Sequence, residues 1–214
     1  MKEASHTWVS GKTGCRFLSA RYITQNFISH YHDFYVIGTN ITGAHEWEGV
    51  GSKTIVPPSA IAVIHPGEIH TGNRINDAPS WVYRSIYPLP DQLSEIAGIM
   101  DRKLLPRFRS SVIHDSKLAE LFARIHRQHE SQGDCLAVES AFLIFMQQLF
   151  SRHSDLRGRS PKIYSFKFKR VNDYIHDNFY RNVSLDELSG TAGMSKYHFL
   201  RSFKAATGLT PHTY

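Results

Sequence analysis

Cysteine is scarce in this chain, since its 214 residues contain only Cys15 and Cys135. Two cysteines cannot build the disulfide framework of a small secreted protein. Long apolar runs are also missing, because the longest, residues 141–146, is far too short to cross a bilayer. The opening residues, MKEASHTWVSG, lack the apolar stretch of a signal peptide. We therefore expect a cytoplasmic protein with no membrane segment.

Signatures of common catalytic chemistry are absent as well. The sequence has no glycine-rich phosphate loop, no G-x-S-x-G motif and no cysteine paired with a plausible base. Its composition, with 41% hydrophobic and 21% charged residues, is typical of an ordinary globular protein. These features favour a folded protein that is not an enzyme.

The positive charge lies mainly in the last quarter of the chain. The net charge is +6, and residues 161–214 hold eight Lys or Arg against four Asp or Glu. A local basic excess is the electrostatic footprint expected of a segment that binds phosphates. A basic balance of this size also occurs in proteins that bind no nucleic acid, so it is weak evidence alone.

Residues 184–211, SLDELSGTAGMSKYHFLRSFKAATGLTP, predict two short helices joined by a tight turn. Ser184 and Glu187 have the spacing of a capping box, which begins a helix. Gly193 suits the left-handed conformation that ends one, and Ser195 is a cap for the next. This pattern is typical of a helix-turn-helix, whose second helix enters the major groove of DNA.

The spacing of apolar residues divides the second helix into two faces. We expect Phe199, Phe203 and Ala206 to be buried, with Gly208 and Pro211 closing the helix. The outward face then holds the predicted DNA contacts, Lys196, Tyr197, Leu200, Arg201 and Lys204. The arginine can pair with both acceptors of a guanine, whereas the lysines suit phosphates. An ordinary helical hairpin with a solvated basic face is the alternative.

Short segments rich in β-branched and aromatic residues fill the first part of the chain, separated by Gly and Pro. They are residues 15–22, 34–41, 52–56, 61–64 and 81–87. Several short strands at regular spacing predict a β-barrel or sandwich.

After Pro90 the pattern becomes helical. Residues 114–131 predict an amphipathic helix, and residues 136–150 are apolar over more than one face. The second helix is either sandwiched between the barrel and the first helix or forms a dimer interface. The polar segment 152–162, with Gly158 and Pro161, indicates a linker.

Three histidines in the barrel region could act together. His30 and His32 form an H-x-H that on a strand would point to one face, and His70 follows in PGEIH. Three imidazoles can bind a divalent metal with open positions, or they can line a pocket. The other candidates for a ligand pocket are Arg16, Trp47, Arg74, Trp81 and Tyr83. An arginine there would favour a carboxylate or phosphate ligand.

The run GMSKYHFLRSFKAATGLTPHTY at the end of the chain resembles the first helix-turn-helix of the AraC/XylS transcription regulators. Residues 168–179, FKRVNDYIHDNF, are similar to that family's opening helix. By motif match, Tyr197, Leu200 and Arg201 stand where the family places base-facing residues, although Leu200 departs from the polar residue often found there. The resemblance implies binding to double-stranded promoter or operator DNA.

The segment VPPSAIAVIHPGEIH and the H-x-H pair resemble the cupin barrel of AraC-type sensor domains. Metal-binding cupins usually add a Glu shortly after H-x-H, where this chain has Val36 and Ile37. The resemblance therefore implies histidines that line the pocket of a small-molecule effector, with no metal and no cofactor. A metal-dependent cupin enzyme, using His30, His32 and His70, is the alternative.

Pattern and resemblance together predict an α+β protein with an N-terminal cupin-like β-barrel, a following helical pair and an incomplete all-α helix-turn-helix domain. The expected parts are a sensor (1–100), a helical dimerisation region (101–152), a linker (153–163) and half of a DNA-binding domain (164–214). The implied function is a ligand-responsive homodimeric regulator of transcription. The family carries two helix-turn-helix units, so a chain that stops at Tyr214 is expected to be a fragment or the product of a truncated gene, which could sense and dimerise without binding DNA.

Overall fold

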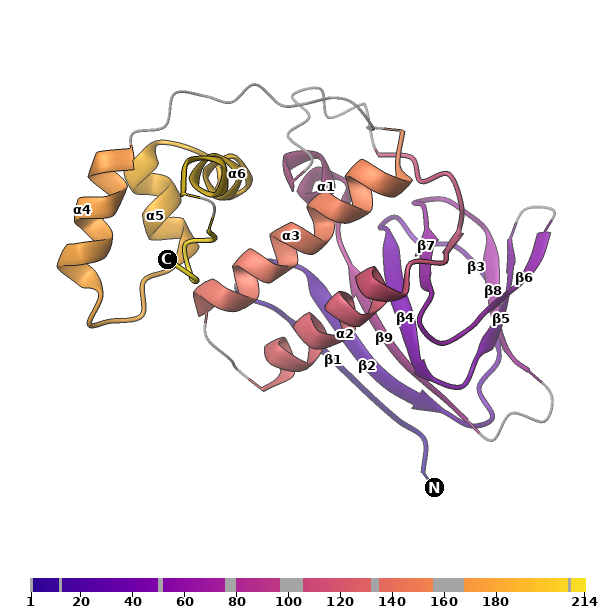
Figure 1. Cartoon of the computed structure of the whole chain (residues 1–214). Helices are drawn as coiled ribbons and strands as arrows, with labels where there is room; N and C mark the ends of the chain where they lie inside the picture. The colour runs from indigo at the N-terminus through magenta and orange to yellow at the C-terminus, as the bar shows by residue number, and fades with distance from the viewer. Residues whose placement is uncertain are drawn as a thin grey trace.

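The computed structural model has a β-sheet half, a pair of long helices across one sheet and a unit of three helices at the far end (Figure 1). It describes residues 2–11, 13–49, 52–75, 80–96, 106–131, 135–155, 168–207 and 209–214. The predicted α+β class is confirmed.

Two antiparallel sheets form the first half. The six-stranded sheet has the order β1 (Ala4–Val9), β2 (Arg16–Tyr22), β9 (Trp81–Tyr87), β4 (Val36–Thr42), β7 (Ile61–Ile64) and β10 (Val112–Ile113). The four-stranded sheet has the order β3 (Phe27–His30), β8 (His70–Arg74), β5 (His45–Gly49) and β6 (Ser52–Val56). All four residues of β7 are buried, as expected of a central strand covered on both faces.

Six helices complete the described chain. They are α1 (Pro90–Ile96), α2 (Ser116–Glu130), α3 (Cys135–His153), α4 (Phe168–Asn178), α5 (Leu185–Ala192) and α6 (Lys196–Thr207). Asp115 begins α2 by accepting a hydrogen bond from the Leu118 N–H at 3.0 Å. Its other oxygen lies 3.1 Å from Arg152 and 3.2 Å from His153, so the end of α3 is tied to the start of α2.

The sequence located most of the apolar elements. The strands expected at 52–56, 61–64 and 81–87 have these bounds, and the helices expected at 114–131 and 136–150 are α2 and α3 with shifted ends. It missed β1, β3, β5, β8, β10 and α1. The linker expected at 153–163 falls largely outside the described residues, as does the boundary expected near residue 100.

The apolar circumference of α3 is covered within the chain. Phe145, Met146 and Leu149 are fully buried, and Leu143 is nearly so. The helix packs on α2 and α1 and also on α5 and α6 (Figure 1). One continuous apolar cluster therefore runs from Phe17 of β2 through α3 to Phe203 of α6. Because α3 is covered by other parts of the same chain, its apolar composition is not evidence for a dimer interface.

Within the described ranges, no helix has both the length and the apolar character required to cross a membrane.

Candidate functional site

A cavity of about 160 Å³ lies between the two sheets. Six of the eight residues predicted for a ligand pocket line it, namely His30, His32, Trp47, His70, Trp81 and Tyr83. Side chains from β2, β4, β7 and β9 form one wall, and side chains from β3, β5 and β8 form the other. The cavity thus lies inside the barrel, where sites for small molecules are expected.

The histidine cluster forms by a route that strand alternation did not predict. The rings of His30 and His70 have centroids 4.4 Å apart, and His32 lies 4.8 Å and 5.2 Å from them. Strand β3 ends at His30, so His32 is not part of the strand. His30 and His70 converge because they pair across β3 and β8, and His32 follows two residues after His30 and contacts both rings.

Backbone carbonyls orient two of these rings. His30 Nδ1 lies 2.6 Å from the Ile28 carbonyl oxygen, and His70 Nδ1 lies 2.9 Å from that of Glu68. A carbonyl only accepts, so each Nδ1 donates and each neutral ring keeps a lone pair on Nε2. Burial lowers the pKa of His32 to about 4, with the other two rings adding to the effect. Burial also lowers the pKa of His70, so His32 and His70 are uncharged at neutral pH.

The same cluster fits a metal only in part. One nitrogen atom from each of the three rings can be chosen so that all lie within 4.8 Å of one another. Three neutral imidazoles can hold a divalent cation with open positions. Val36, which the sequence has where metal-binding cupins place a Glu, lines the cavity with an apolar side chain. This wall supplies no fourth protein ligand at that position.

The cavity wall also contains hydrogen-bond donors that are not used by the described part of the chain. The indole Nε1 atoms of Trp47 and Trp81 are buried and have no partner there. His45 stacks on Trp81 with centroids 4.4 Å apart and is held by Asn40. Burial lowers the pKa of His45 to about 4, so this ring is also neutral. Buried donors without acceptors are rare, so these two indoles are unusual among the residues that line the cavity.

Neither predicted arginine lies in this wall. Arg16 is exposed at the start of β2, and Arg74 lies at the end of β8, outside the residues that line the cavity. The lining residues that the structure describes include no Lys or Arg. The cavity wall therefore gives no reason to expect a carboxylate or phosphate ligand.

Sequence reasoning missed several lining residues, and alternation could have found three of them. Tyr87 lies on the same face of β9 as Trp81 and Tyr83, His45 lies two residues before Trp47 on β5, and Gly72 lies two residues after His70 on β8. No comparable signal marked the others, which include Tyr22, Phe27 and Thr71.

The helices α4 to α6, called the reading unit below, confirm the local predictions for a helix-turn-helix. Ser184 and Glu187 form the capping box, and Gly193 is left-handed with φ 66°. The Met194 N–H donates to the Ser189 carbonyl at 3.0 Å, which closes α5 in a Schellman-type turn. Ser195 accepts from the His198 N–H at 3.4 Å and begins α6. The expected closing residue Gly208 lies outside the described residues.

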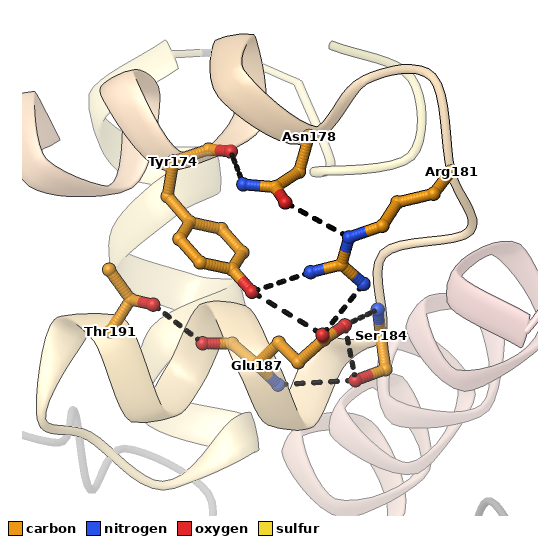
Figure 2. A network of polar contacts seen from close by, with 6 residues as sticks. All are labelled: Tyr174, Asn178, Arg181, Ser184, Glu187 and Thr191. Atoms are coloured by element: carbon orange, nitrogen blue, oxygen red, sulfur yellow. Dashed lines mark hydrogen bonds and ion pairs between the residues drawn. The ribbon is translucent and has the colours of Figure 1, made fainter.

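A polar network joins α4 to the start of α5 (Figure 2). Arg181 contacts Glu187 at 2.8 Å, the Tyr174 hydroxyl at 2.8 Å and Asn178 at 2.9 Å. Glu187 also accepts from the Ser184 N–H at 2.8 Å. That backbone bond and then Arg181 lower the pKa of Glu187 to about 2. One carboxylate thus fixes both the helix start and the angle between two helices.

We expect Glu187→Gln to lower the melting temperature of the reading unit at neutral pH. A carboxyl whose pKa falls from 4.5 to about 2 on folding stabilises the fold above pH 4.5, and this contribution is lost as the pH falls toward 2. The wild type should therefore lose stability across that window more steeply than the variant. Thermal melts followed by circular dichroism would measure both effects. Asp177→Asn, at an exposed position on α4, is the control, and equal slopes for wild type and Glu187→Gln would contradict the assignment.

The exposure expected on α6 is partly wrong. Arg201 and Lys196 are half-buried and Lys204 is exposed, but Tyr197 and Leu200 are 7% and 3% exposed. Ala206 is exposed, although it was expected to be buried. Tyr197 is covered because α6 packs on α3 as well as on its own hairpin, and it lies at that junction with Phe142 and Leu143. Contact of these residues with DNA stays a prediction.

Two family comparisons match most of the chain. Residues 13–146 match the family described as the AraC-like ligand binding domain. Residues 175–214 match bacterial regulatory helix-turn-helix proteins of the AraC family. The first match spans the barrel from β2 onward, α1, α2 and part of α3, and the second spans α5, α6 and the end of α4.

The chain is also similar to individual proteins. An uncharacterized HTH-type transcriptional regulator of Bacillus subtilis, YbfI, is 30% identical over 195 residues, which cover 90% of this chain and 70% of that protein. A Cupin 2 conserved barrel domain protein from Salinispora arenicola is 14% identical over 45% of this chain and 83% of its own, with a TM-score of 0.38. A double-stranded β-helix protein from Klebsiella pneumoniae is 21% identical over 41% and 76%, with a TM-score of 0.34.

Proposed function

The chain belongs to the AraC family of ligand-responsive, DNA-binding transcription regulators, and from that premise we propose that the cavity between its two sheets is the effector site. The observation that carries this proposal is a cavity inside the barrel that is lined by aromatic and apolar side chains together with His30, His32, His45 and His70. A site shaped for a ligand has few polar groups among apolar walls, and the four imidazoles are groups of this kind.

The chemistry of the wall favours a small uncharged effector rich in oxygen acceptors. Two indole N–H groups can donate to it, and neutral His32, His45 and His70 can donate or accept. Aromatic faces from Trp81 and Tyr83 suit the C–H surface of such a molecule. A carboxylate or phosphate would lose its hydration there without gaining a cation.

We expect neutral sugars and polyols to raise the melting temperature of the protein more than carboxylic acids of similar size. Trp47→Phe and Trp81→Phe keep an aromatic wall but remove one donor each, so each should weaken the response by about 1 kcal/mol or more, roughly fivefold. Thermal-shift titration with a panel of both compound classes would measure this. Trp8→Phe is the control, since Trp8 stacks on Phe17 outside the cavity. Shifts caused only by the acids would contradict the proposed effector class.

A metal-dependent enzyme is the second candidate, and the geometry of His30, His32 and His70 favours it. We propose a sensing role instead, because Val36 and the unpartnered donors suit a ligand pocket. Elemental analysis of the purified protein separates the two. Stoichiometric iron, manganese or zinc that disappears in His32→Ala would support the enzyme.

We also propose that the protein acts as a homodimer in the cytoplasm. Regulators with a helix-turn-helix commonly bind two half-sites as two-fold dimers, and bacterial DNA lies in the cytoplasm. The proposed parts remain a sensor (1–100), a helical region (101–152), a linker (153–163) and a DNA-binding segment (164–214). Effector binding would shift the balance between arrangements of these parts, which changes how the reading helices meet DNA.

A further inference from the structure

Glu139 of α3 has a carboxylate buried against the reading unit. The residue is 3% exposed. One oxygen accepts a hydrogen bond from the backbone N–H of Leu185 at 3.2 Å, and the other lies 3.9 Å from Lys196 Nζ. Lys196 also pairs with Asp186 of α5 at 2.7 Å. A buried carboxylate needs such partners to offset its desolvation, so this contact fixes how α5 and α6 sit on α3.

The two donors that meet Glu139 are of the kind that bind phosphate. Leu185 is the first residue of α5, a helix of eight residues, so its N–H has no partner within the helix. This N–H group points away from α5 along its axis, at the positive end of the helix dipole. Lys196 begins α6. Helix N-termini and lysines are common phosphate contacts in protein–DNA complexes, and a carboxylate presents the same charge to them.

The same packing covers part of the reading helix. Tyr197 and Leu200 are almost fully buried, whereas base contact needs them on the surface. Tyr197 faces a junction cavity of about 280 Å³, which it lines together with Phe142 and Leu143 of α3. The arrangement that places Glu139 on Leu185 and Lys196 is therefore one in which α6 faces the sensor.

We propose that the Leu185 N–H and Lys196 form a phosphate-contact site for DNA, and that Glu139 fills this site in the arrangement in which α6 faces the sensor. This arrangement is called closed below. The DNA backbone and α3 then compete for the same donors, so the sensor restrains DNA binding by presenting an anion of its own. This inference rests on the proposed regulator function and adds to it a contact residue pair and a competitor. Glu139 is a positioning residue, because it acts through Lys196 and α5.

The test is the affinity of the full chain for double-stranded DNA of mixed sequence at low salt, measured by fluorescence anisotropy. Glu139→Gln keeps the shape but removes the charge, and we expect it to bind about tenfold more tightly. Because phosphate contacts are gained, the dependence of log affinity on log salt should steepen by about 1. Glu95→Gln is the matched control, because it removes the same charge from a residue of α1 that lines the same junction cavity. It should change the affinity far less.

A double variant tests whether the gain in DNA affinity depends on Lys196. Adding Lys196→Ala to Glu139→Gln should abolish most of the tightening and return the salt slope to that of the wild type. If circular dichroism shows that Glu139→Gln misfolds, Glu139→Asp replaces it, because the shorter side chain keeps the charge but reaches Leu185 less well. It should tighten binding in the same direction by a smaller factor.

Three outcomes overturn the proposal. They are a folded Glu139→Gln or Glu139→Asp that binds no more tightly than the wild type, an equal gain in Glu95→Gln, and a gain that survives Lys196→Ala. Failure of the regulator function looks different, since then neither the wild type nor any variant would bind DNA at low salt.

Discussion

Replacing Phe199 with alanine is expected to unfold the reading unit while the barrel stays folded. Phe199 has no exposed surface, and its ring lies 5.5 Å from that of Phe203. Deleting a buried phenyl group from a packed core costs about 3–5 kcal/mol, because a cavity remains. The unit consists of three short helices, and the net stability of a small domain is only about 5–15 kcal/mol. A loss of this size removes much of what holds the unit together.

The chain offers separate signals for its two halves. Its three tryptophans, Trp8, Trp47 and Trp81, all lie on strands of the barrel half. Tryptophan emission therefore follows the barrel, whereas far-ultraviolet circular dichroism also follows α4 to α6. We expect Phe199→Ala to lose helical signal and DNA binding at a temperature where its tryptophan emission is native. Lys204→Ala, at an exposed position on the same helix, should retain both the helical signal and the native tryptophan emission. A single transition in both signals would show that the two halves unfold together through the apolar cluster at α3.

The elements that the sequence identified are those with strong local signals. Strands β7 and β9 are rich in apolar and aromatic residues, and α5 begins with a capping box that forms as expected. Most of the missed strands are rich in polar residues, and β10 has only two residues. Strand β1, ASHTWV, is exposed along most of its length, and β8 reads HTGNR. Such strands exist because neighbouring backbones pair with them, and periodicity in a single segment does not reveal pairing.

The site shows the same division. The grouping of His30, His32 and His70 was predicted, although only the pairing of β3 with β8 explains it. The burial of Tyr197 and Leu200 was not predictable from the hairpin, because the apolar period of α6 describes its packing on α5 and says nothing of α3. A residue that reads DNA in one arrangement can be core in another. Helical period alone therefore cannot separate the two roles.

Replacing Arg201 with alanine is expected to relax base preference more than it weakens binding. Its guanidinium is partly exposed and lies 5.6 Å from the centroid of the Tyr197 ring, near the face that would enter the groove. A bidentate arginine contact with guanine provides roughly 1–3 kcal/mol of discrimination, about five- to 150-fold at one base pair. Lys204 is exposed one turn later and suits a phosphate, so Lys204→Ala should lower affinity on every sequence alike.

Selection from a random duplex library, followed by competition with the preferred site, would measure both effects. Arg201→Lys refines the result, because lysine keeps the charge but cannot form the two parallel bonds of a guanidinium. It should therefore lose base preference as Arg201→Ala does while retaining most of the affinity. Equal losses for Arg201→Ala and Lys204→Ala on all sequences would mean that Arg201 contacts only phosphate.

Repeating the selection with Glu139→Gln connects this test to the closed arrangement, since releasing α6 from α3 should strengthen the base preference that Arg201 provides. If the preference is unchanged by that release, Arg201 already reaches the bases while Tyr197 is covered.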